Sequence, residues 1–136
     1  MRIITKILVT GILILAGSFN TVSEFDLENK LIGNWSYYSD NNESGVWTKV
    51  DKLDLTKSGL EFKEKGELIV RMNSGSCGTP PITYKNYNGT WKKISDSTLV
   101  LTHKFWGGVA KRSILIKTLN EKQLIFEALN DEIIRN

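Results

Sequence analysis

Apolar and polar residues alternate one by one through most of this chain, a pattern that predicts β-strands. The clearest case runs from Leu60 to Met72, where two alternating segments flank Lys65-Gly66. A turn between two such segments predicts an antiparallel hairpin. Eight to nine strands of this kind follow one another with short turns and almost no helix between them. This succession favours an all-β fold, a small antiparallel up-and-down β-barrel of about eight strands.

The remaining elements follow from the same pattern. A short lead-in helix is expected between Phe19 and Lys30, with Ser23-x-x-Asp26 as its cap. Loops are expected where turn-forming residues cluster, and strands where alternation resumes. The expected loops are Asp40–Gly45 and Asn73–Pro81. The expected strands include Val46–Leu55, Ile82–Tyr84 and Trp91–Ile94 with a turn or bend at Asn88-Gly89 between them, Thr98–Trp106, and a last hairpin of Val109–Thr118 and Gln123–Leu129.

Two copies of a Gly-x-Trp pattern each open an alternating segment. They are Gly33-Asn34-Trp35 and Gly89-Thr90-Trp91. A glycine permits a bend or a close backbone approach, and a tryptophan two residues later points to the same face of the strand. These four Gly and Trp residues are therefore predicted to close one end of the barrel, because an indole ring is large enough to plug it.

The first 18 residues resemble a secretory signal peptide rather than part of the barrel. A short cationic segment precedes the uncharged stretch Ile7–Ala16, and the small residues Gly17-Ser18 follow it. Ten apolar residues are too few for a stable membrane span. Ser18 stands where a bacterial lipobox needs a cysteine, so no lipid anchor is expected there. We expect an exported product, periplasmic or secreted, in which residues 19–136 form one domain.

Charge argues against a nucleic-acid partner. The whole chain has a net charge of +3, but without Arg2 and Lys6 of the leader it has 16 basic and 15 acidic residues. Cys77 is the single cysteine, so no internal disulfide can form. Its thiol either packs as a small apolar group or is exposed for an intermolecular disulfide.

Several segments together resemble the secreted bacterial lipocalin-like domains of the calycin superfamily. They are Leu31-Ile32-Gly33-Asn34-Trp35, Gly59-Leu60-Glu61-Phe62, Gly89-Thr90-Trp91 and the loop Cys77-Gly78-Thr79-Pro80-Pro81. The resemblance covers nearly all of the chain after the leader. It implies an eight-stranded barrel with a cavity for a small apolar molecule.

The inward positions of such a barrel can either hold a ligand or fill the interior with their own side chains. If a pocket exists, aromatic side chains with polar tips and flexible apolar side chains are its expected walls. The candidate ligand-binding residues are Tyr37, Phe62, Met72, Tyr84, His103, Phe105 and Trp106.

His103, the single histidine, has three possible roles. It is a partly buried side chain bonded to a loop, a polar anchor for a ligand, or a base for Cys77. One histidine and one cysteine are too few for a metal site, and neither paired carboxylates nor a nucleophile elbow is evident. We therefore expect no catalytic residue, no metal and no cofactor.

The sequence thus predicts an exported, non-enzymatic barrel that binds or carries a small apolar molecule. The alternative is a protein-interaction or inhibitor module that uses the rim loops, with a filled core. The sequence does not name the ligand or the oligomeric state.

Overall fold

The computed structural model describes residues 24–38, 45–75 and 78–136, which form a closed antiparallel barrel of eight strands preceded by one short helix. The signal-peptide prediction, Ser23 and Cys77 lie outside these residues. None of the described helices is long and apolar enough to cross a membrane. The elements are α1 (Glu24–Leu31), β1 (Gly33–Tyr38), β2 (Val46–Val50), β3 (Gly59–Phe62), the 3-10 turn η1 (Glu64–Gly66), β4 (Glu67–Asn73), β5 (Tyr84–Lys93), β6 (Thr98–Phe105), β7 (Gly108–Leu119) and β8 (Gln123–Arg135).

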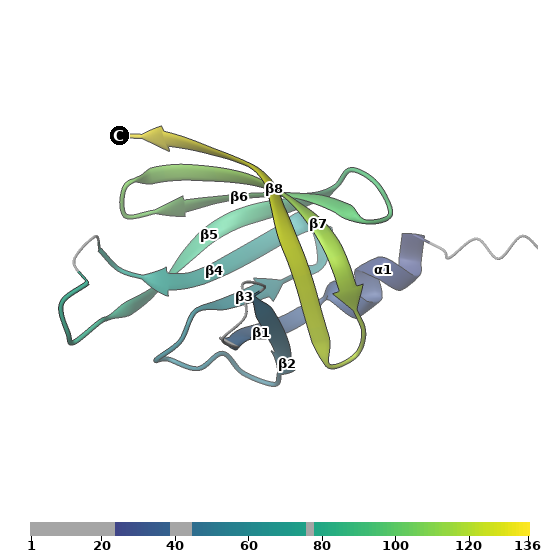
Figure 1. Cartoon of the computed structure of the whole chain (residues 1–136), viewed down its shortest axis with the longest axis horizontal. Coiled ribbons are helices and arrows are strands. Elements are labelled where there is room, and N and C mark those ends of the chain that lie inside the picture. Colours follow the sequence, from purple (N-terminus) through teal and green to yellow (C-terminus); the bar gives the residue numbers. More distant parts are fainter. Residues whose placement is uncertain (1–23, 39–44, 76–77) are drawn as a thin grey trace, which may run out of the picture.

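The predicted fold class is confirmed, and the strand order adds one detail to it. Around the barrel the order is β1-β2-β8-β7-β6-β5-β4-β3, and β3 pairs with β1 to close the wall. Strands β3 to β8 follow the simple up-and-down order. β2 lies between β1 and β8 instead of beside β3, so the connection from β2 to β3 passes β1 (Figure 1).

Helix α1 and two tryptophans fill one end of the barrel. The indole of Trp35 is fully buried, and its Nε1–H donates to the carbonyl oxygen of Leu31 at 2.8 Å. Trp91 packs edge-on against Phe62 at 6.0 Å between ring centroids and donates to the carbonyl oxygen of Lys63. Each large ring thus has a partner for its polar N–H, which its burial requires.

The two glycines of the Gly-x-Trp patterns occupy places that a side chain would disturb. Gly33 has a φ of +132°, and a Cβ there would lie 2.9 Å from Cε of Lys49. The ammonium of Lys49 lies 5.2 Å from the centroid of the Trp35 ring, a cation–π contact at this closed end. Gly33 thus leaves room for the lysine that covers Trp35.

The predicted turn or bend at Asn88-Gly89 is wrong, because β5 continues through it. Neighbouring strand β6 approaches Gly89 so closely that a Cβ there would lie 2.7 Å from Cβ of His103 and closer still to the carbonyl oxygen of Thr102. The glycine serves this close approach between strands rather than a change of direction.

The prediction of a strand from Val46 to Leu55 is correct only as far as Val50. The side chain of Asp54 accepts hydrogen bonds from the backbone N–H and the hydroxyl of Thr56, and so forms a local turn. These two hydrogen bonds hold the pKa of Asp54 below its ordinary value. A side chain that satisfies the backbone locally competes with strand pairing, which ends β2 early.

The last hairpin is longer than predicted. β8 runs to Arg135 instead of Leu129, and Asn130, Asp131 and Glu132 pair with β7. Only Gln123, Leu124 and Ile125 of β8 also pair with β2. Beyond Ile125, β8 pairs with β7 alone among the described strands. The barrel wall therefore stands open beside the second half of β8, at the end away from α1 (Figure 1).

Candidate ligand-binding site

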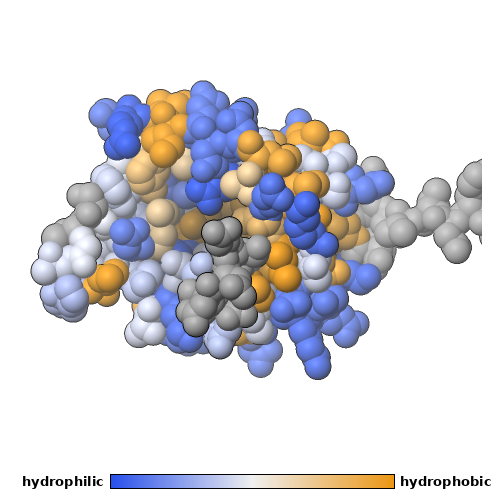
Figure 2. All heavy atoms as spheres, in the orientation of Figure 1, coloured by the Kyte–Doolittle hydropathy of each residue, from blue (hydrophilic) through white to orange (hydrophobic). Residues whose placement is uncertain are grey.

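A cavity of about 290 Å³ occupies the open half of the barrel, beside the part of β8 that lacks a second neighbour. Figure 2 shows hydrophobic side chains toward the middle of this face, with hydrophilic groups above and below them. The walls come from β2 to β8 except β5, and the residues are Trp47, Ser58, Leu60, Val70, Arg71, Met72, Leu101, His103, Phe105, Ala110, Arg112, Phe126 and Ile133.

The floor of the cavity separates it from the filled half of the barrel. Leu60, Val70 and Leu101 are buried there and belong to the same apolar cluster as Trp35 and the residues around it. Alternation along β3, β4 and β6 directs these side chains inward. The interior is thus filled by side chains at the α1 end and open at the other end. The sequence analysis left a filled interior and a cavity as alternatives, and the barrel contains one of each.

Aromatic rings form one wall. Trp47 stacks on Phe126 with 5.7 Å between ring centroids and 15° between ring planes. Tyr37 meets the other side of this pair, edge-on to Trp47 at 5.1 Å. The register of β2 and β8 causes this contact, because Trp47 lies opposite Leu124, two residues before Phe126. A flat aromatic wall offers a large apolar contact surface to a guest molecule.

His103 is one of the few polar residues of the cavity lining. It lies opposite Gly89 on β5 and opposite Ala110 on β7. Its Nδ1 lies 2.9 Å from the carbonyl oxygen of Lys104. Burial lowers the pKa of His103, the hydrogen bond to Lys104 opposes this shift, and the positive charge of Arg112 adds to it. The imidazole is therefore neutral near pH 7.

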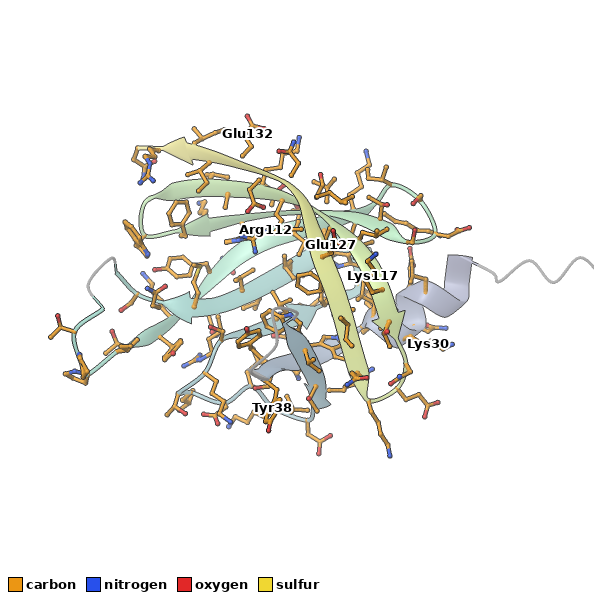
Figure 3. All side chains as sticks on the ribbon, viewed as in Figure 1. Lys30, Tyr38, Arg112, Lys117, Glu127 and Glu132 are labelled. Atoms are coloured by element: carbon orange, nitrogen blue, oxygen red, sulfur yellow. The ribbon has the colours of Figure 1, made fainter. Side chains whose placement is uncertain are left out.

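Arg112 and Asp131 form an ion pair on the inner face of the β7–β8 hairpin. Nε of Arg112 donates to one carboxylate oxygen of Asp131 at 2.6 Å, and Nη2 donates to the other at 3.1 Å. About half of each side chain is exposed, 50% and 46%. In Figure 3 the Arg112 side chain lies beneath the β6–β7 hairpin toward the interior, whereas Glu132 points away from the barrel.

The structure brings three of the predicted ligand-binding residues, Met72, His103 and Phe105, into the cavity lining. Tyr37 contacts the lining through Trp47, and the exposed Trp106 packs edge-on against Phe105.

The two other predicted ligand-binding residues do not line the cavity. Phe62 is buried in the filled half against Trp91, and Tyr84 lies on the face of β5 opposite to Tyr87.

Sequence reasoning did not select Trp47, Ala110, Arg112 or Ile133. The inward position of Trp47 could have been read from alternation after Val46. Arg112 could not, because an arginine within an alternating strand is ordinarily assigned to the solvent side. The long β8, which sequence reasoning ended at Leu129, also brings Ile133 to the cavity.

Metal binding has no support from the described part of the chain, which holds no group of three or more His, Cys, Asp or Glu residues able to ligate an ion. Comparison with family models, curated proteins and solved structures found no match to this chain.

Proposed function

We propose that this protein is an exported, lipocalin-like barrel that binds a small apolar molecule in the cavity of its open half. The observation that carries the proposal is the division of the interior. Large rings and α1 fill one half, while about 290 Å³ lined mainly by apolar side chains stays open in the other. This volume is near the lower limit for small-molecule pockets, about 300 Å³.

The volume sets the size of the ligand. At about 30 Å³ for each water-sized group, the cavity holds roughly ten non-hydrogen atoms. A ligand of this size is smaller than a long-chain lipid. The opening beside β8 gives it a route of entry, because only β7 pairs with that part of the strand among the described elements.

Binding rather than catalysis is proposed because the charged and titratable side chains of the lining already have partners, including Arg71, which bonds to Asn86 and to the carbonyl oxygen of Leu55. Asp131 engages Arg112 through both oxygens, and His103 bonds to the carbonyl oxygen of Lys104. Neither pair includes a nucleophile. Such groups orient a guest without reacting with it.

The test is uptake of 1-naphthylamine, a neutral fluorescent probe close to the cavity in size, by the purified protein and two variants. Met72→Lys puts a charge into the cavity, whereas Ile69→Lys puts the same charge on the outer face of the same strand, opposite Glu61. We expect the first substitution to abolish uptake and the second to leave it unchanged.

Circular dichroism and urea unfolding establish that both variants are folded. Uptake that survives in a folded Met72→Lys variant contradicts the proposed cavity. No uptake by the unsubstituted protein contradicts the proposed function and favours a module that binds a protein partner through its rim loops.

A further inference from the structure

The polar corner of the cavity, made of His103 and the Arg112–Asp131 ion pair, has no net charge. Arg112 gives two of its nitrogens to the two oxygens of Asp131, so its positive charge is already matched. Its third nitrogen, Nη1, makes no hydrogen bond within the described residues and stays available as a donor. The corner therefore offers a neutral ion pair with unused N–H donors on Nη1.

His103 supplies the complementary acceptor. A carbonyl oxygen can only accept, so the contact of 2.9 Å with Lys104 places a proton on Nδ1. In the neutral ring Nε2 then carries a lone pair and accepts a hydrogen bond. The hydrogen bond thus selects the tautomer of the neutral ring before any ligand binds.

The donor and the acceptor come from neighbouring positions on two paired strands. His103 is paired with Ala110, and Arg112 with Leu101, so the two residues are diagonal neighbours on the inner faces of β6 and β7. Side chains in this relation are within about 8 Å at their Cβ atoms. The imidazole and the guanidinium both extend from these positions, and a hydroxyl oxygen that makes two hydrogen bonds of about 2.8 Å joins nitrogens up to about 5.6 Å apart.

We propose that the cavity selects an uncharged apolar molecule with one hydroxyl group, a medium-chain alcohol in its simplest form. The hydroxyl donates to Nε2 of His103 and accepts from Nη1 of Arg112, while the hydrocarbon lies against Trp47 and Phe126. This inference rests on the proposed function and adds the chemical class of the ligand.

A carboxylate fits this corner less well than an alcohol. Asp131 already holds the guanidinium, so a second carboxylate meets a negative charge as well as a positive one. A fully apolar guest removes water from Nη1 and Nε2 and returns no hydrogen bond. Both comparisons favour the alcohol.

The experiment compares decanol, decanoate and nonyl methyl ether, which are similar in length, as displacers of 1-naphthylamine at pH 7.5. The ether accepts a hydrogen bond but cannot donate one. We expect decanol to bind about tenfold more tightly than either competitor, the effect of one good hydrogen bond. Decanoate that binds as tightly as decanol overturns the inference and leaves the proposed function standing. If the probe itself does not bind, the proposed function fails first.

Asp131→Asn provides an independent measurement, because it frees the charge of Arg112. We expect decanoate to gain about tenfold in affinity in this variant and decanol to change little. His103→Phe should remove the advantage of decanol over the ether. An unchanged order of the three ligands in both folded variants contradicts the assignment of the corner.

Discussion

Filling the cavity from Ala110 is the sharpest test of whether it exists. Ala110 points into the open half from the inner face of β7, and Ala110→Phe adds six carbons to a space that holds roughly ten non-hydrogen atoms. At about 0.8 kcal/mol for each buried carbon, a ligand that loses six carbons of contact loses about 5 kcal/mol. Uptake of the probe should fall by more than about a thousandfold.

Protein stability should change little, because the new ring enters space that is empty. We expect the free energy of unfolding, measured by urea titration, to stay within about 1 kcal/mol of the parent. Val109→Phe is the matched control, since Val109 directly precedes Ala110 on β7 and faces outward, opposite Ile134. It should leave uptake unchanged.

Two results would refute this reasoning. A folded Ala110→Phe variant with unchanged probe affinity would show that the ligand lies elsewhere. A loss of stability beyond about 3 kcal/mol would show that the space is already packed.

Three further predictions concern the framework. Gly89→Ala should lower the free energy of unfolding by about 3 kcal/mol, because its Cβ meets backbone of β6, whereas Gly75→Ala, with open space around it, should change little; urea titrations compare them. Trp35→Phe removes the hydrogen bond to Leu31 and should cost about 2 kcal/mol without weakening probe uptake, and an equal loss of uptake would contradict the separation of the two halves. The lowered pKa of His103 means that the unfolded chain binds more protons than the folded one, so stability should fall as the pH drops below 6.5. In His103→Gln the Tm should therefore depend less on pH between pH 4 and pH 7 than it does in the parent. Identical Tm profiles of the two proteins would contradict this.

The alternation of apolar and polar residues is enough to predict the hairpins, because the two strands of a hairpin are adjacent in the sequence. The β3–β4 hairpin follows from the alternating residues on both sides of Lys65-Gly66, and the β7–β8 hairpin from the alternating segments Val109–Thr118 and Gln123–Leu129. The inward side of each strand follows as well, since one buried position fixes the rest.

What alternation misses depends on pairing between distant parts of the chain. Val46 to Leu55 alternates well, yet the turn at Asp54 ends the strand, and the polar segment after Leu129 is held in β8 by β7. The candidate site shares this limit. Arg112 faces inward with Asp131 beside it only because β7 and β8 pair in one particular register.

Isothermal titration calorimetry with decanol is the most direct test of ligand binding. We expect a stoichiometry of one molecule per chain and a negative change in heat capacity, the marker of apolar surface removed from water. Both signals should vanish in Ala110→Phe and persist in Val109→Phe. No measurable binding of decanol or of the neutral probe by the folded, unsubstituted protein would contradict a ligand-binding barrel.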